Sequence, residues 1–243
     1  MCTFAENIFQ MNALVTGATK GIGREITFAL AKKGYDLALI ARTESDLEEL
    51  KYALNSQYPS RKIILLPCDI SQKKEIEKIT SFLKKEWITL DVLINNAGIY
   101  TTGTVTEEAD GILESCIATN LFSAYYITRA FADMMKNAGK GHVFNMCSVL
   151  SKKARVDASA YTISKFALLG FNKVLCEDMR CFGVKVTAIL PGSTNTASWD
   201  GFNAPAEEFV QPKDVANAII NALEMSHSAL VEEIVVKPLH PGI

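Results

Sequence analysis

Six apolar runs that alternate with stretches of helical periodicity constrain the fold of this chain more than any other feature. The runs span residues 11–16, 36–41, 62–68, 91–95, 142–148 and 184–190. Strands separated by single helices favour a parallel sheet covered on both faces, and right-handed crossovers lead to a doubly wound arrangement. We therefore predict a single-domain α/β fold over residues 11–243, with a seventh strand, "EEIVVKP", at one edge of the sheet.

The composition indicates a soluble protein that acts on small molecules. The 243 residues are 49% apolar, enough for one large core. A net charge of −2 without a basic stripe argues against nucleic acid and acidic membranes as partners. No apolar stretch approaches the roughly 18 residues that span a bilayer, and residues 1–10 lack the order of a secretion signal. We expect a cytoplasmic protein in which residues 1–10 are a loose extension.

The cysteines and histidines do not indicate a metal site. None of the six cysteines forms a C-x-x-C pair, and four lie in apolar segments where they would pack as small hydrophobes. This pattern indicates a reducing compartment. His142, His227 and His240 are scattered along the chain, which favours surface or strand-end positions over zinc ligation.

Two helical stretches, residues 112–135 and 159–179, are apolar on more than one face. A stripe about 100° wide would suffice to face one sheet. The surplus apolar surface indicates a homodimer or homotetramer. Deeper burial within a monomer is the alternative.

Tyr161 and Lys165 stand four residues apart in a stretch of helical pattern, so both side chains lie on one helix face. Ser148 ends an apolar run shortly before them, and the end of a strand and the start of a helix can converge. A serine, a tyrosine and a lysine would then gather around one carbonyl group.

The same spacing occurs at Tyr58 and Lys62, with Ser45 thirteen residues before the tyrosine. Pro59 disfavours a continuing helix at that point. Tyr58 and Lys62 therefore belong to a connection between elements and share no helix face.

A cation beside Tyr161 would change its acidity. Lowering the pKa of a phenol from about 10 to about 7 takes roughly 4 kcal/mol. A positive charge about 5 Å away at an effective dielectric of about 20 supplies on the order of 3 kcal/mol. On this basis Lys165 is expected to make Tyr161 fit for acid–base chemistry.

The segment "TGATKGIG" follows the first predicted strand and places Gly17, Gly21 and Gly23 in one turn. Glycines permit positive φ and close approach of a ligand, and the next helix N-terminus offers unpaired N–H groups. The loop can hold phosphate, although the spacing G-x-x-x-G-x-G differs from G-x-G-x-x-G. An ordinary turn is the alternative for the loop taken alone.

Ala41 and Arg42 occupy the end of the second predicted strand, where NAD sites usually carry an acidic residue. Arg42 can meet a ribose 2′-phosphate with its planar guanidinium, and Lys20 adds a second charge. The sequence therefore favours NADP(H) over NAD(H). The alternative is that both are solvated surface charges.

Eight features in fixed order give the chain a resemblance to the classical short-chain dehydrogenase/reductase family, over nearly its whole length. They are Thr16–Gly23, Asp69, "NNAG" at Asn95–Gly98, Asn120, Ser148, Tyr161, Lys165, and "PG" at Pro191 and Gly192. The resemblance implies a Rossmann fold and an NADP(H)-dependent oxidoreductase.

The resemblance also implies which residues bind the cofactor. Asp69 and Ile70 would border the adenine, Lys165 would hold the nicotinamide ribose, and Thr196 would touch the nicotinamide end. The full set is Gly17, Thr19, Lys20, Gly21, Ile22, Arg42, Asp69, Ile70, Asn95, Ala97, Gly98, Tyr161, Lys165, Pro191, Gly192, Thr194 and Thr196. Thr194 departs from the family pattern, which usually has Val or Ile there.

The implied reaction is hydride transfer to the carbonyl of an aldehyde, ketone or 3-oxo acid. Tyr161 acts as general acid, Ser148 donates a hydrogen bond to the same oxygen, and Lys165 relays protons through a chain anchored by Asn120. For single residues there are plainer alternatives: Ser148 as a strand-end cap and Asn120 as a helix-interior asparagine. Reduction of a 3-oxoacyl group on acyl carrier protein, and a non-catalytic NADPH sensor, are the alternatives for the whole chain.

The candidates for the substrate pocket follow Ser148 and Pro191. They are Val149, Leu150, Val156, Trp199 and Phe202. The segment after Pro191 is short for a substrate lid, which predicts a compact or open apolar pocket. The ending "EEIVVKPLHPGI" is closer to small carbonyl and 3-hydroxy acid reductases than to carrier-protein reductases, although basic residues such as Arg129 and Arg155 could contact an acidic carrier protein.

Overall fold

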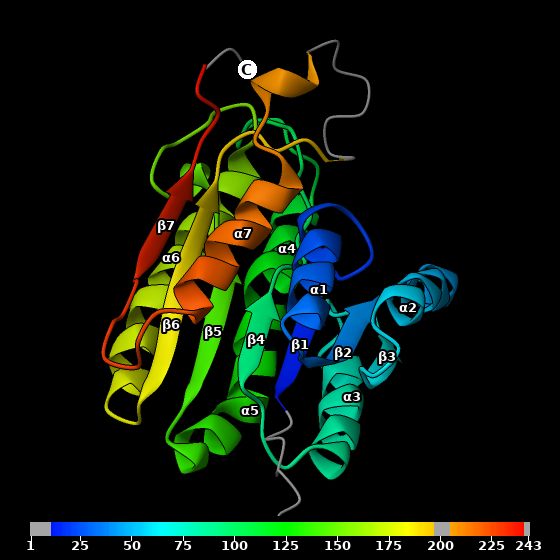
Figure 1. Ribbon diagram of the computed structural model, residues 1–243. Coiled ribbons are helices and arrows are strands. Elements are labelled where there is room, and N and C mark those ends of the chain that lie inside the picture. Colours follow the sequence, from blue (N-terminus) through cyan, green and yellow to red (C-terminus); the bar gives the residue numbers. More distant parts are fainter. Residues whose placement is uncertain (1–10, 197–204, 241–243) are drawn as a thin grey trace, which may run out of the picture.

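The computed structural model describes residues 11–196 and 205–240. Its centre is a seven-stranded sheet with the order β3-β2-β1-β4-β5-β6-β7, in which every pair of neighbouring strands is parallel (Figure 1). The strands are β1 (Asn12–Thr16), β2 (Asp36–Ala41), β3 (Ile63–Pro67), β4 (Val92–Asn95), β5 (Gly141–Met146), β6 (Val184–Pro191) and β7 (Glu233–Val236). The predicted doubly wound sheet and its seventh, edge strand are confirmed.

Helices cover both faces of the sheet. They are α1 (Gly21–Lys32), α2 (Glu44–Gln57), α3 (Lys73–Glu86), α4 (Ile112–Ile117), α5 (Ser123–Ala138), α6 (Ser159–Arg180) and α7 (Pro212–Leu223). One apolar cluster joins α1, α2 and α7 to the sheet, and a second joins α3, α5 and α6 to the other face. Figure 1 shows α1 and α7 side by side on the near face.

The strand sequences suit a sheet that is buried on both faces. All five residues of β1 are buried, and β4 is buried throughout its four residues. Continuous apolar runs are typical of parallel strands between two helical layers. The strand order reverses between β1 and β4, and ligands of such sheets bind at the carboxyl ends of the strands near this switch point.

The boundaries differ from the sequence predictions at two places. The run expected to form a strand over residues 142–148 ends as a strand at Met146, because Cys147 bonds back to Asn145 and Ser148 begins a short 3₁₀ helix, η2 (Val149–Ser151). The helical stretch 112–135 is interrupted by a π-helical turn, η1 (Ala118–Phe122). Both differences bring polar side chains to the carboxyl edge of the sheet.

His142 lies at one end of β5, one of the two expected positions, and it is buried there. It is the second residue of β5, its ring stacks on Phe144 at 3.9 Å between centroids, and Nε2 lies 2.7 Å from Thr187 Oγ1. The sequence of the strand does not indicate that its first residues are buried. Burial lowers the pKa of His142 to about 3.

Three further observations complete the fold. No helix in the described part of the chain is long and apolar enough to span a bilayer. Within that part, four cysteines are buried as expected, and Cys181 is exposed. Tyr58 and Lys62 lie between the end of α2 and the start of β3, so the repeated spacing forms no shared helix face.

Candidate active site

The predicted catalytic residues meet at the carboxyl edge of the sheet. Loops after β1, β4, β5 and β6 lie along this edge, because all seven strands run in the same direction. α6 begins there as well, with Tyr161 in its first turn. The position beside the β1–β4 switch point is where a doubly wound sheet binds its ligand.

Tyr161 and Lys165 occupy one face of α6. Lys165 Nζ lies 5.6 Å from the centre of the Tyr161 ring and donates a hydrogen bond of 2.7 Å to the Met146 carbonyl at the end of β5. The lysine is almost fully buried. The carbonyl therefore fixes the ammonium against the strand end, beside the phenol ring.

Ser148 has two roles in the structure. Its Oγ accepts a hydrogen bond of 3.1 Å from the Leu150 amide and so caps the 3₁₀ helix, which agrees with the alternative of a strand-end cap. The same side chain is hydrogen-bonded to Tyr161. A serine fixed by its cap therefore presents its hydroxyl to the phenol.

Asn120 lies in the π-helical turn, and its side chain bonds to residues far away in the sequence. Its Oδ1 accepts from the Ile99 amide at 2.8 Å, and its Nδ2 donates to the Ile99 carbonyl at 3.0 Å and to Ser164 Oγ at 2.8 Å. The alternative of an asparagine bonded to its own helix is wrong. π-turns are frequent at functional sites, and here the turn connects the loop after β4 to α6.

Burial shifts the two ionisable groups in opposite directions. It raises the pKa of Tyr161 to about 12, against the hydrogen bond with Ser148, and lowers the pKa of Lys165 to about 8. The expectation that Lys165 makes Tyr161 acidic is therefore wrong for the protein by itself. That argument included the attraction and omitted desolvation, which is the larger effect in a buried site.

The glycine loop between β1 and α1 has the close approaches that its sequence predicts. A Cβ on Gly17 would lie 2.9 Å from Ala97 Cα, and one on Gly23 would lie 2.1 Å from the Gly17 carbonyl oxygen. The first turn of α1 holds no acidic side chain, and the side chain of its N-cap residue, Lys20, makes no capping bond to the helix amides. Thr19 lies within the loop, and Ile22 packs against the core below.

The two cations predicted to meet a 2′-phosphate lie in different surroundings. Arg42 follows β2 directly and is exposed. Lys20 Nζ lies 3.0 Å from Asp46 Oδ2 of α2. A groove of about 240 Å³ runs between the loop and α2, lined by Thr19, Lys20, Arg24, Asp46, Glu49 and Leu50. Asp46 therefore already offsets the charge of Lys20.

Asp69 and Ile70 follow β3, at the same edge of the sheet. The Asp69 carboxylate accepts a hydrogen bond from the Ser71 amide, and Ile70 is buried. Asn95 is turned inward: its Nδ2 donates to Thr128 Oγ1 at 3.0 Å and to Asn145 Oδ1 at 2.9 Å. The side chain of Asn95 therefore supports the interior of the fold.

Gly98 is the closest part of "NNAG" to the catalytic residues. A Cβ there would lie 3.1 Å from Asn120 Oδ1 and 3.4 Å from Lys165 Nζ. Ala97 contacts Gly17 of the glycine loop. This segment therefore joins the two halves of the site.

The segment after β6 reaches the glycine loop. The Gly192 amide, after Pro191, donates to the Val236 carbonyl at 2.7 Å, and Thr194 is buried with Oγ1 bonded to the Gly192 carbonyl at 2.9 Å. Thr196 Cγ2 lies 3.0 Å from the position of a Cβ on Gly21. In the structure Thr196 thus contacts the loop predicted to bind phosphate.

The predicted substrate residues are only partly placed. Val149 and Leu150 form the 3₁₀ helix next to Ser148, and Val156 is 74% exposed on the loop before α6. Trp199 and Phe202 lie outside the described residues. The predicted lid is therefore not described.

The sequence interpretation missed two residues at the site. Asn96 Nδ2 donates to the carbonyls of Thr16 and Gly17 at 3.0 and 3.1 Å, which holds the glycine loop in place. Tyr100 packs edge-on against Tyr161, with ring centroids 4.9 Å apart. "NNAG" could have indicated Asn96, but no pattern in the sequence marks Tyr100.

Known proteins are similar to this chain in sequence over most of its length. Residues 11–207 match the family described as short chain dehydrogenase. An uncharacterized oxidoreductase of Staphylococcus saprophyticus is 30% identical over 93% of this chain and 97% of its own length. Sepiapterin reductase of Chlorobaculum tepidum is 29% identical over 93% and 95% of the two chains.

A solved structure extends the likeness to three dimensions. A metagenomic short-chain oxidoreductase, crystallised in complex with NADP, superposes with a TM-score of 0.82 at 28% identity, covering 95% of this chain and 97% of that one. Fold, sequence match and the order of the site residues agree. This chain is thus a member of the short-chain dehydrogenase/reductase family, of the classical type.

Proposed function

We propose that this protein is an NADPH-dependent oxidoreductase that reduces the carbonyl group of an aldehyde, ketone or 3-oxo acid. The observation that carries the proposal is the convergence of Ser148, Tyr161 and Lys165 at the carboxyl edge of the sheet, beside the glycine loop. A sensor that only bound the dinucleotide would have no use for this proton-transfer set.

The glycine loop and the start of α1 fit a dinucleotide pyrophosphate. Backbone amides without a side-chain cap and an N-terminus without acidic residues favour a bound anion. Arg42 would bind the 2′-phosphate, and the NADP complex of the metagenomic relative supports this choice. Lys20 would contribute less, because Asp46 already pairs with it.

Bound NADPH supplies the hydride, and the chain's own residues handle the proton. The hydroxyls of Ser148 and Tyr161 would both contact the substrate oxygen, which gains negative charge as the hydride arrives. Because burial holds the pKa of Tyr161 near 12, the phenol keeps its proton at neutral pH. An alkoxide is about as basic as hydroxide and far more basic than a phenolate, so proton transfer from Tyr161 is downhill.

Lys165 and Asn120 would maintain this arrangement. Lys165 is fixed by the Met146 carbonyl next to the phenol, where its positive charge opposes the desolvation of a phenolate. Asn120 holds the Ile99 backbone and Ser164 together and would anchor the proton relay. Both residues thus serve to return a proton to Tyr161 after each turnover.

A spectrophotometric screen tests the proposal. NADPH consumption would be followed with aldehydes, ketones, 3-oxo acids, and 3-oxoacyl thioesters both free and on acyl carrier protein. We expect steady oxidation with at least one free carbonyl class, abolished by Tyr161→Phe while NADPH binding persists. Turnover of carrier-bound thioesters alone would support the carrier-protein reductase instead. Binding of NADPH without any turnover would support the sensor.

We further propose that the protein is a homodimer or homotetramer assembled through α5 and α6. Tyr125 of α5 and Phe171 of α6 have ring centroids 5.6 Å apart, so the two helices form one continuous surface. Apolar side chains on and next to these helices are exposed, with Val174 at 71%, Phe122 at 45% and Phe166 at 44%. Contiguous exposed apolar surface of this kind typically marks a protein interface.

A further inference from the structure

A second tyrosine lies beside the proposed acid. The ring of Tyr100 meets the ring of Tyr161 edge to face, with centroids 4.9 Å apart and an interplanar angle of 67°. Tyr100 is 38% exposed, so one part of its ring packs on Tyr161 and another part faces outward. None of the proposed proton transfers needs this residue.

The backbone on both sides of Tyr100 is fixed. On one side, both polar groups of the Ile99 backbone are hydrogen-bonded to Asn120. On the other side, the Gly103 amide donates to the Asp157 carbonyl at 2.9 Å, and the Ser159 amide donates to the Gly103 carbonyl at 3.0 Å. Tyr100 is therefore held by a short segment with two anchors and does not sit on a free loop.

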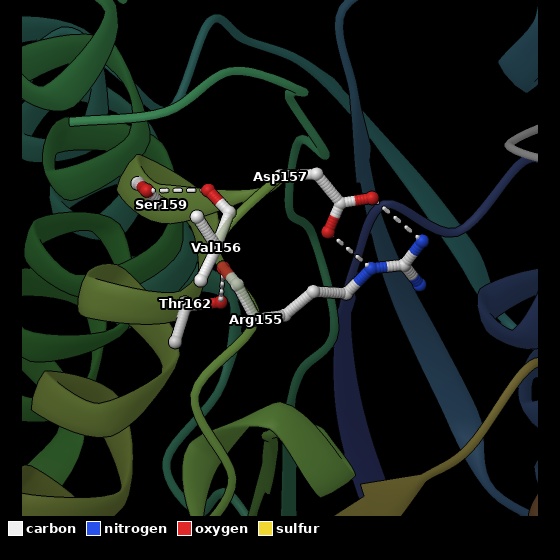
Figure 2. Close-up of polar contacts among 5 residues, drawn as sticks. All are labelled: Arg155, Val156, Asp157, Ser159 and Thr162. Carbon is white, nitrogen blue, oxygen red and sulfur yellow. Dashed lines mark hydrogen bonds and ion pairs between the residues drawn. The ribbon is translucent and has the colours of Figure 1, made fainter. Parts of the chain in front are cut away.

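The loop before α6 is paired through Gly103 with the segment that carries Tyr100. In that loop Arg155 Nε and Nη2 donate to the two carboxylate oxygens of Asp157 at 2.8 and 3.0 Å, as Figure 2 shows. Ser159 Oγ donates to the Val156 carbonyl at 2.8 Å, which turns the loop into α6 (Figure 2). The hydrogen bond with Asp157 is the main cause that raises the pKa of Arg155, and Tyr100 adds a smaller contribution, so Tyr100 lies within electrostatic reach of the guanidinium.

These contacts define the room available to a substrate. A carbonyl oxygen that bonds to Ser148 and Tyr161 places its carbon about 3–4 Å from the phenol oxygen, given ordinary hydrogen-bond and bond lengths. The groups attached to that carbon extend a few ångströms further. The Tyr100 ring packs directly on the Tyr161 ring, with centroids 4.9 Å apart, so it lies next to the phenol that these groups approach.

We propose that Tyr100 is a specificity-determining residue whose ring forms a wall of the substrate site and limits the size of the group attached to the carbonyl carbon. The inference rests on the proposed function. Because the wall is a large, anchored aromatic ring, small substituents fit beside it and extended ones do not. Branched or bulky substituents would have to displace it.

The test compares substrates of different size across variants at Tyr100. The kinetic constants kcat and KM for NADPH-dependent reduction would be measured with propanal, benzaldehyde and 2-naphthaldehyde. Tyr100→Ala opens the wall, Tyr100→Trp enlarges it, and Tyr100→Phe keeps the ring without the hydroxyl. Tyr52→Ala is the matched control, because Tyr52 is 80% exposed on α2.

We expect Tyr100→Ala to raise the naphthaldehyde-to-propanal ratio of kcat/KM by about tenfold or more, the usual scale of discrimination by a hydrophobic pocket. Tyr100→Trp should lower the ratio below that of the wild type. Tyr100→Phe and Tyr52→Ala should leave it within about threefold. The change for Tyr100→Ala should lie mainly in KM, since the ring contacts the substrate in both the ground and the transition state.

Two outcomes would overturn the inference. A purely structural Tyr100 would lower kcat for all aldehydes alike and leave the ratio constant in both Tyr100→Ala and Tyr100→Trp. NADPH binding, followed by fluorescence, shows that each variant is folded, and the oppositely directed Trp variant gives a second measurement should the Ala variant be unstable. A wild type that reduces no carbonyl compound would refute the proposed function and this inference with it.

Discussion

Tyr161 and Lys165 show how burial can reverse a conclusion drawn from charge alone. Their spacing identified the pair in the sequence, and the structure places Lys165 Nζ 5.6 Å from the phenol ring as that spacing predicts. The direction of the pKa shift could not be predicted, because desolvation depends on everything packed around the two groups. A tyrosine that stays protonated at neutral pH suits the reductive direction of the proposed reaction.

Arg42 offers a direct test of cofactor choice at the level of one side chain. We expect Arg42→Asp to weaken NADPH binding by about 10- to 100-fold, since it removes a charge-assisted hydrogen bond and adds a repulsion. NADH lacks the 2′-phosphate, so its affinity should change much less. Fluorescence titration with both dinucleotides measures the two effects.

The control for this titration is Lys85→Asp, an equal change of charge at an exposed position in the last turn of α3, at the end of the helix away from Asp69. It should leave both affinities within about twofold, because exposed charges farther apart than a Debye length are screened. Equal losses of NADPH and NADH affinity in Arg42→Asp would place the 2′-phosphate elsewhere.

At the scale of elements, periodicity predicted every strand and the helix that carries Tyr161, but not the π-turn between α4 and α5. A single extra residue shifts the apolar stripe too little to break its pattern over residues 112–135. The turn depends on tertiary bonds from Asn120 to Ile99, which no local pattern encodes. For the same reason the inward orientation of Asn95 was not predicted.

The burial of His142 in β5 makes the stability of the protein sensitive to acid. The pKa of His142 is about 3 in the folded protein and about 6.5 in an unfolded chain, so the unfolded state binds the extra proton as pH falls between these values. Stability should therefore be lost from about pH 6.5 downward, by up to about 5 kcal/mol when the pH has fallen to about 3. Urea unfolding at a series of pH values measures the loss.

His142→Gln isolates this contribution, because glutamine can also donate to Thr187 but does not titrate. The variant should be less stable than the wild type at pH 7, since it lacks the stacking on Phe144. The difference between the two should then shrink as pH falls to 4. Parallel stability curves would show that His142 does not titrate as its burial implies.

At the scale of the whole molecule, the apolar surface on α5 and α6 tests the proposed assembly. Val174→Asp would put a charge on that surface, at an exposed position of α6, and should reduce the wild-type oligomer to a smaller species, seen by sedimentation velocity. Ile88→Asp is the control, because Ile88 is also exposed, at 93%, but lies in the connection between α3 and β4. A monomeric wild type, or a Val174→Asp variant of unchanged mass, would contradict the proposal.

The side-chain amide of Asn96, which follows β4, donates to the carbonyls of Thr16 and Gly17. It therefore joins the two halves of the sheet where β1 pairs with β4. The first three strands cannot shape the phosphate loop alone, since part of its support comes from a segment about eighty residues later in the chain. Affinity for the dinucleotide and stability of the sheet are therefore thermodynamically linked, so a change that strengthens one strengthens the other.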